Sequence, residues 1–249
     1  MRWLVLTDIH GNIEALDAIL VAVPLGTYDR LLVLGDLVGY GASPNEVVDR
    51  LYELEPNSLI RGNHDKVASG IGTARHFNRL AAQAAMWTLK TLTVENLERI
   101  ANLPSGPCII DRQIEICHGT PFDEDVYVFN ELDAKRALEA SQHQICFFGH
   151  THVPVVFEST EGSLQALIPD PNPEGITTVA IHRDCKYLIN PGSVGQPRDG
   201  DPRAAYAIFD SKESQVTLYR IDYPVNLAQQ KIFESELPEY LAYRLALGR

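Results

Sequence analysis

The sequence predicts an α/β fold built in layers. Up to about residue 150, short apolar runs alternate with stretches whose apolar residues recur at helical spacing, a pattern typical of layered α/β domains. From about residue 153, strand-like runs follow one another without helices between them, which indicates a mainly antiparallel sheet packed on the first layer. Because no linker-like composition divides the two parts, we expect residues 1–249 to form one domain.

The first elements are two strands and two helices. Residues 2–8 (RWLVLTD) predict a buried strand, and Ile13, Leu16 and Ile19 mark the apolar face of the helix that follows. A second strand is expected at 30–36. The run Ser43-Pro44-Asn45-Glu46 then supplies an N-cap serine, a proline at the first helical position and a glutamate at the capping-box position. It predicts the start of a second helix.

Further strands and helices alternate along the rest of the chain. A strand is expected at 58–63, followed by a long helix over 77–92 whose face of Phe77, Leu80, Ala84 and Trp87 favours core packing over a ligand site. Strands at 113–119 and 145–150 flank a helix that begins near Asn130. The later strand-like runs are 153–158, 163–168, 175–181, 186–190, 204–210 and 215–221, with a proline-rich surface loop at 169–175 and a helical tail without chemistry at 225–249.

Composition and charge limit the classes of partner. With 33 acidic against 21 basic residues, the formal net charge is −12, which disfavours nucleic acid because phosphate backbones bind basic surfaces. No apolar run approaches the roughly 20 residues of a membrane span, and the start MRWLVLTDIH is too polar for a secretory segment. Four scattered cysteines without a CxxC pair favour free thiols. We therefore expect a cytoplasmic protein with no membrane partner.

Residues able to bind metal follow five of the predicted strands, usually beside glycine. The clusters are Asp8-Ile9-His10-Gly11, Gly35-Asp36, Gly62-Asn63-His64-Asp65, His118-Gly119 and Gly149-His150-Thr151-His152. A single strand-end histidine is ordinary, but five of the eight histidines lie in these clusters. Because ligands of layered α/β folds bind beyond the carboxyl ends of the strands, we expect the clusters to converge.

The mixture of side chains predicts the kind of metal. Carboxylates, an amide oxygen and several imidazoles suit Mn²⁺, Fe²⁺, Co²⁺, Ni²⁺ or Zn²⁺ and contain too much nitrogen for a dedicated Mg²⁺ or Ca²⁺ site. Seven ligands exceed what one such ion needs, so two ions that share a carboxylate are expected. The candidate ligands are Asp8, His10, Asp36, Asn63, His118, His150 and His152.

In order, spacing and residue type, this series resembles the calcineurin-like metallophosphoesterase superfamily. Residues 190–198 (NPGSVGQPR) are also similar to a stretch of its small prokaryotic phosphodiesterases. The resemblance implies a layered α-β-β-α sandwich, with mixed sheets flanked by helices. It further implies two divalent ions, with Mn²⁺ favoured over Fe, Zn, Co or Ni. One would be held by Asp8, His10 and His152, the other by Asn63, His118 and His150, and Asp36 would bridge them.

The same resemblance implies a phosphoesterase. A metal-bridging hydroxide would attack the phosphorus in line, and His64, a catalytic residue that binds no metal, would donate a proton or hydrogen bond to the leaving oxygen. We expect a phosphodiesterase that acts on a small or nucleotide-like phosphate ester. Asp65 has two open interpretations: it orients or charges the His64 imidazole, or it is an acid at a helix start.

Departures from the family pattern narrow the substrate. Protein Ser/Thr phosphatases carry Asp-Arg soon after the bridging carboxylate, whereas this chain has Gly39-Tyr40 there. The missing arginine weighs against a protein phosphatase. Arg198 is a candidate substitute, although a surface-loop position is favoured. A non-catalytic scaffold of the same fold and a phosphomonoesterase remain alternatives; a DNA nuclease is disfavoured by the charge, and no pattern indicates an oligomeric state.

A few other polar residues have ordinary expected roles. His76, His143 and His182 lack convergent partners, so we expect them at the surface or in caps. Cys117 precedes His118 in a strand and should point to the opposite face, into the core. Asn12 is expected to cap the first helix.

Overall fold

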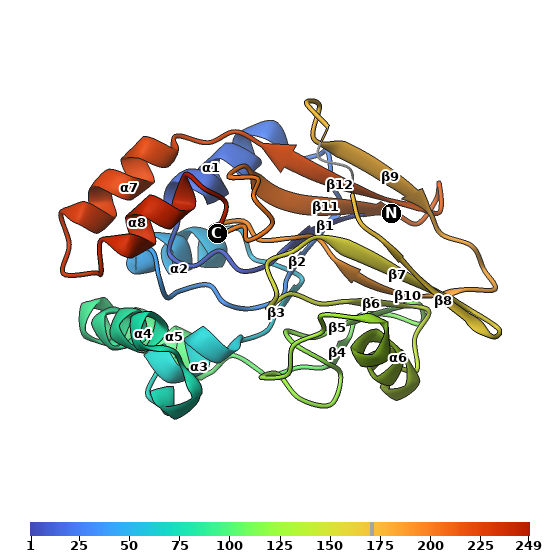
Figure 1. The fold of residues 1–249 in the computed structure, drawn as a ribbon, viewed down its shortest axis with the longest axis horizontal. Helices are drawn as coiled ribbons and strands as arrows, with labels where there is room; N and C mark the ends of the chain where they lie inside the picture. The colour runs from blue at the N-terminus through green and yellow to red at the C-terminus, as the bar shows by residue number, and fades with distance from the viewer. Residues whose placement is uncertain (170–171) are drawn as a thin grey trace.

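The computed structural model describes residues 1–169 and 172–249, which form two six-stranded sheets packed face to face (Figure 1). The first sheet has the order β3 (Ser58–Leu59), β2 (Arg30–Val33), β1 (Arg2–Leu6), β11 (Ala204–Asp210), β12 (Gln215–Ile221), β9 (Ile176–Ala180). The second has the order β4 (Cys108–Ile109), β5 (Ile114–Ile116), β6 (Ile145–Phe147), β10 (Lys186–Asn190), β7 (Val155–Thr160), β8 (Ser163–Leu167). Both sheets mix parallel and antiparallel pairs. In the first, β1 pairs in parallel with β2 and antiparallel with β11; in the second, β10 pairs in parallel with β6 and antiparallel with β7.

Helices cover the outer faces of both sheets. Those packed over the first sheet include α1 (Ile13–Ala22), α2 (Pro44–Glu53), α4 (Arg79–Thr91), α5 (Val94–Ala101), α7 (Val225–Phe233) and α8 (Tyr240–Leu245). The short α3 (Asn63–Ala68) packs against α4 and α5, and a 3-10 turn spans Ala74–His76. On the second sheet lies α6 (Glu131–Ala140). Within the described ranges, no helix is long and apolar enough to cross a membrane.

Strand β1 illustrates how sequence creates these layers. Trp3 and Val5 belong to the core between the two sheets, while Leu4 and Leu6 belong to the core between the first sheet and its helices. A strand buried on both faces needs apolar residues at every position, because successive side chains point to opposite sides. The layered α-β-β-α sandwich implied by the resemblance is confirmed.

The expectation of a separate antiparallel sheet after residue 153 is wrong. Strands from that part of the chain join both sheets: β9, β11 and β12 extend the first, and β7, β8 and β10 extend the second. An apolar strand pairs wherever a hydrogen-bonding edge is open, which its own sequence does not specify. This interleaving supports our proposal that residues 1–249 form one domain.

Some element boundaries also differ from expectation. The strand expected at 58–63 contains only Ser58–Leu59, and α3 begins at Asn63. Phe77 precedes α4 and contacts the His64 ring, with ring centroids 4.6 Å apart, besides packing on the core. The tail is helical as predicted. In the expected loop at 169–175, residues 170–171 lie outside the described residues.

Candidate metal centre

The loops that leave strands of both sheets meet at one buried site. Asp8 and His10 follow β1, Asp36 follows β2, and Asn63 begins α3. His118 follows β5 in the second sheet, and His150 and His152 follow β6. None of the seven predicted ligands is more than 7% exposed.

Four of these side chains form a first group. One donor atom from each of Asp8, His10, Asp36 and His152 lies within 4.8 Å of all the others. The Nε2 atoms of His10 and His152 are 3.0 Å apart, and His152 Nε2 lies 3.3 Å from Asp8 Oδ1. The backbone N–H of His150 donates to the Asp8 carboxylate and holds it in place.

A second group shares Asp36 with the first. Asp36, His118 and His150 also have donor atoms within 4.8 Å of one another. The Nε2 of His118 lies 3.4 Å from Asp36 Oδ2 and 3.1 Å from Asn63 Oδ1. The seven predicted ligands are therefore arranged as two overlapping sets, and Asp36 is the residue common to both.

Backbone carbonyls fix how three imidazoles are presented. The Nδ1 atoms of His10, His118 and His152 lie 3.0, 2.9 and 2.6 Å from the carbonyl oxygens of Val38, Leu34 and Gln196. Each Nδ1–H donates to its carbonyl, which leaves the lone pair on Nε2 free to bind a metal. Two such lone pairs face each other across the 3.0 Å between His10 and His152, an arrangement that repels unless a cation lies beside it.

Polar atoms without partners complete the test of fit. Within the described part of the chain, Asp36 Oδ2 and His150 Nε2 are buried and have no hydrogen-bond partner. A buried polar atom without a partner costs about 1–3 kcal/mol, more when charged. Metal coordination would satisfy both, so the residues present fit divalent cations with nitrogen and oxygen ligands.

The pKa values of the site's side chains also indicate that its carboxylates attract positive charge. Burial alone would lower the pKa of His118, but the carboxylates of Asp36 and Asp8 overcome it and raise that pKa to about 10. Burial and the charge of His118 lower the pKa of His150 to about 3. Burial opposes ionisation of Asp36, yet the surrounding imidazoles hold its pKa well below the usual value. The carboxylates stay ionised and are met by a proton on His118 when no metal is bound.

The backbone at the ligands is unusual. Asp8, His10, Asp36, His150 and His152 have positive φ angles of 53°, 52°, 53°, 67° and 60°. Residues other than glycine rarely adopt these backbone angles, and each instance costs on the order of 1–3 kcal/mol. Five strained positions at one site indicate that the fold holds the donors in place at the expense of stability.

The segment NPGSVGQPR at 190–198 supports the ligand loops. Ser193 Oγ and the Gly195 N–H both donate to the Asp8 carbonyl, at 2.7 and 3.0 Å. Asn190 Nδ2 donates to the Gly149 carbonyl at 2.8 Å, and the Gln196 carbonyl binds His152. This stretch therefore connects the Asp8 loop to the loop that carries His150 and His152.

Glycine at position 62 is required by the bridging carboxylate. A Cβ atom there would lie 2.1 Å from Asp36 Oδ1, although the φ of Gly62 is an ordinary −106°. We expect Gly62→Ala to displace Asp36 and weaken metal binding at least about tenfold, measured by metal titration of the depleted protein. Gly162, in the hairpin turn between β7 and β8, has open space for a Cβ but a φ of +88°, which strains any side chain. Gly162→Ala is therefore a control for backbone strain without a clash and should leave metal affinity unchanged, with folding checked by thermal melting. Equal affinities for the two variants would contradict the steric argument.

His64 lies beside the first group of donors and belongs to neither of the two groups. Its ring is 4.9 Å from His10 and 4.4 Å from Tyr40, and its Nδ1 has no partner among the described residues. Burial lowers its pKa to about 4; Asp36 opposes this shift, and the charge of Arg198 adds to it. Asp65 accepts from the N–H groups of Gly62 and Val38 at 2.9 and 3.1 Å, which favours the helix-start interpretation over contact with the imidazole.

Several residues near the centre were not predicted from the sequence. Tyr127 stacks on His150 with centroids 3.7 Å apart, and Tyr40, between two glycines at a φ of 61°, lies 4.8 Å from His10. The glycines on either side of Tyr40 are a sequence signal for an unusual loop backbone, whereas no sequence pattern around Tyr127 indicates that it lies in the site. Arg198 is partly buried in a loop, and its guanidinium carbon lies 5.6 Å from the centroid of the Tyr40 ring, so this loop borders the site. Arg244 of α8 lies 5.9 Å from the same ring, and the tail is not remote from the site.

The minor candidates mostly behave as expected. Asn12 caps α1 by accepting from the Ala15 N–H, and Cys117 is in the core under α6. His76 and His182 are exposed. His143 instead lies 3.6 Å from Glu115 and is largely buried.

Comparisons with known proteins agree with this geometry. The calcineurin-like phosphoesterase superfamily domain matches residues 1–214. An uncharacterized protein of Methanocaldococcus jannaschii is 38% identical over 98% of this chain and 97% of its own. Phosphodiesterase YfcE of Escherichia coli is 23% identical over 85% of this chain and 88% of its own. The crystal structure of a metallophosphoesterase from Sphaerobacter thermophilus, 37% identical, covers 100% of this chain and 99% of its own with a TM-score of 0.86.

Proposed function

Because the chain belongs to the calcineurin-like phosphoesterase superfamily, we propose that it is a metal-dependent phosphodiesterase that acts on a small or nucleotide-like phosphate ester. The observation that carries the proposal is the pair of donor groups that share Asp36. Because the relative YfcE is named a phosphodiesterase, we infer a diester substrate in preference to a monoester for this chain. The absence of the phosphatase Asp-Arg pair also weighs against a phosphoprotein substrate.

Two divalent ions are part of the proposal, with Mn²⁺ first and Fe, Zn, Co or Ni as alternatives. Asp8, His10 and His152 would hold one, Asn63, His118 and His150 the other, and Asp36 both. Such ions supply water activation and Lewis-acid stabilisation of charge on the phosphoryl group. The four free thiols fit the cytoplasmic location that we also propose.

The protein's own residues position the substrate and assist its cleavage. The His64 imidazole would donate a hydrogen bond or proton to the departing oxygen, since its backbone N–H, bonded to Asp36 Oδ1 at 2.8 Å, fixes this residue beside the centre. Phe77, Tyr127 and His76 line the cavity that opens beside His150 and Asn63. This wall would receive one ester group and exclude water around it.

Metal removal and replacement test the proposal. The protein is depleted with a chelator, reconstituted with Mn²⁺, Fe²⁺, Co²⁺, Ni²⁺ or Zn²⁺, and assayed on matched aryl phosphate monoesters and diesters. We expect no turnover without metal, restoration by at least one ion and faster hydrolysis of the diester. Preference for the monoester would make the protein a phosphomonoesterase. No turnover with any ion would favour the non-catalytic scaffold.

A further inference from the structure

Two arginines lie beside the metal centre without an Asp or Glu partner. Arg198 and Arg244 are both partly buried, and their guanidinium carbons lie 5.6 and 5.9 Å from the centroid of the Tyr40 ring. Arg198 donates to Gln196 Oε1, and Arg244 donates to a main-chain oxygen of Arg249. Among the described residues, no Asp or Glu carboxylate lies within 4.0 Å of either guanidinium, so neither is paired with an acidic side chain.

Most partly buried arginines of this acidic protein have a carboxylate partner. Arg50, Arg61, Arg99, Arg203 and Arg220 each have one within reach, whereas the side chain of Arg2 donates to the Gly26 carbonyl. Contact with the Tyr40 ring leaves the charges of Arg198 and Arg244 in place. Burial and the charge of Arg198 lower the pKa of Arg244, which reflects two cations held close together. An anion between them would remove the repulsion.

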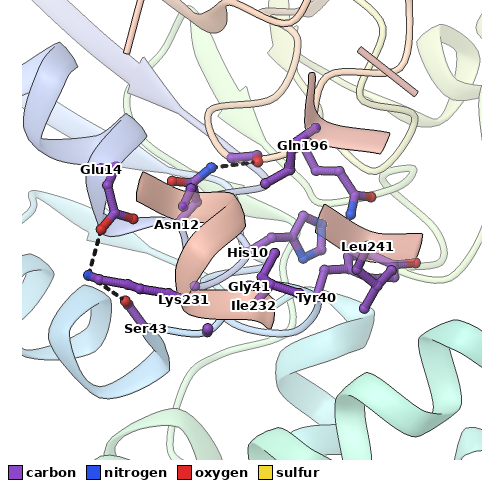
Figure 2. A pocket seen from close by; sticks show the side chains of 15 residues that line it. His10, Asn12, Glu14, Tyr40, Gly41, Ser43, Gln196, Lys231, Ile232 and Leu241 are labelled. Atoms are coloured by element: carbon purple, nitrogen blue, oxygen red, sulfur yellow. Dashed lines mark hydrogen bonds and ion pairs between the residues drawn. The ribbon is translucent and has the colours of Figure 1, made fainter. Parts of the chain in front are cut away.

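The fold itself brings the two arginines together. Leu241 and Leu245 of α8 line a pocket with His10, Tyr40 and Gln196, and Figure 2 shows Leu241, Tyr40 and Gln196 grouped around His10. The Gly200 N–H donates to the Gly248 carbonyl at 2.9 Å. That bond ties the loop of Arg198 to the end of α8, so the pair does not depend on an accidental side-chain position.

The two arginines have different neighbours in the site. The backbone N–H of Arg198 donates to the His152 carbonyl at 3.3 Å, which places the main chain of Arg198 next to a predicted metal ligand. Arg244 lies over Tyr40, whose ring in turn packs on His10 and His64 with centroids 4.8 and 4.4 Å away. Arg198 is therefore the candidate to meet the phosphate at the metals, and Arg244 the candidate for a group beyond it.

We propose that Arg198 and Arg244 form the anion-binding side of the active site, with Arg198 contacting the scissile phosphate and Arg244 a second phosphoryl group joined to it. The substrate class is then a diphosphate ester, such as a nucleoside diphosphate derivative. This deepens, and rests on, the phosphoesterase function proposed above. Arg244 lies outside residues 1–214, so the family match does not supply this role.

Titration calorimetry of the Mn²⁺-loaded protein with AMP and with α,β-methylene ADP, which resists cleavage between its phosphorus atoms, tests the pair. We expect the wild type to bind the diphosphate at least tenfold more tightly than AMP, as a hydrogen bond between charged groups contributes roughly 10- to 100-fold. Arg244→Ala should reduce this ratio to threefold or less. Arg198→Ala should weaken both ligands by at least tenfold. The exposed Arg112, between β4 and β5 at the end of β5 away from His118, provides the charge-matched control Arg112→Ala, which keeps the wild-type ratio.

The outcomes separate this inference from the proposed function. A wild-type protein without preference for the diphosphate, or an Arg244→Ala variant with the wild-type ratio, overturns the role of Arg244. If Arg244→Ala does not fold by thermal melting, Arg244→Lys is used; it keeps the charge but not the planar fork, and a ratio equal to that of the wild type would also overturn the role. The measured quantity is binding, with AMP checked for hydrolysis during the titration, so a preference for the diphosphate that depends on Arg244 supports the arginine pair even if no ester is hydrolysed.

Discussion

Asp36→Asn should abolish most metal binding and lower kcat/KM for an aryl phosphodiester on the order of 1000-fold. Asp36 is the only residue common to both groups of donors, and its Oδ2 lies 3.5 Å from His10 Nε2 and 3.4 Å from His118 Nε2. The asparagine retains the shape but removes the negative charge and one of the two oxygen ligands. Metal content by inductively coupled plasma mass spectrometry and steady-state kinetics measure the two effects.

Two further variants make the Asp36 result specific. Asp8 belongs to the first group alone, so Asp8→Asn should lose about one ion per chain where Asp36→Asn affects both. Asp184 is exposed in the turn before β10, and Asp184→Asn should retain wild-type metal content and rate. A fully loaded and active Asp36→Asn protein would refute the shared carboxylate. Thermal melting checks that each variant is folded.

His64→Ala should retain metal and lose rate in a manner that depends on the leaving group. We expect a loss of roughly 100- to 1000-fold for phenyl or alkyl esters, because a positioned proton or hydrogen-bond donor contributes about that much. For p-nitrophenyl esters, whose leaving oxygen needs little assistance, the loss should stay below about tenfold. The measurement is a series of kcat/KM values plotted against the pKa of the leaving alcohol or phenol. The slope should be steeper for the variant than for the wild type.

The surroundings of His64 define the control for this experiment. His64 is buried and contacts Tyr40 and Phe77, so His64→Ala also leaves a cavity. A purely structural effect of this cavity would lower kcat/KM equally for every substrate. His182 is exposed and belongs to none of the strand-end clusters. His182→Ala should have the wild-type kcat/KM for all esters. Equal losses for activated and unactivated esters would rule out assistance to the leaving group.

Much of the candidate site could be predicted from local sequence. Each predicted ligand follows an apolar run or begins a helix, and these patterns depend on residues within one short segment. Parallel neighbours end at the same edge of a sheet, which brings together the carboxyl ends of β1 and β2 in one sheet and those of β5 and β6 in the other. Asp8, His10 and Asp36 form one such set and His118, His150 and His152 another, and the packing of the two sheets joins the sets.

The layered α/β class, the strand-end donors and the family resemblance can be predicted from the sequence alone, since they depend on nearby residues and their order. The division of the later strands between both sheets and the approach of Arg244 to Tyr40 could not be predicted in this way. The positive φ angles of five predicted ligands are also visible only in the folded chain. These features depend on which distant segments pack and hydrogen-bond together, and the pairing energy of a strand or helix face is set by its partner rather than by its own residues.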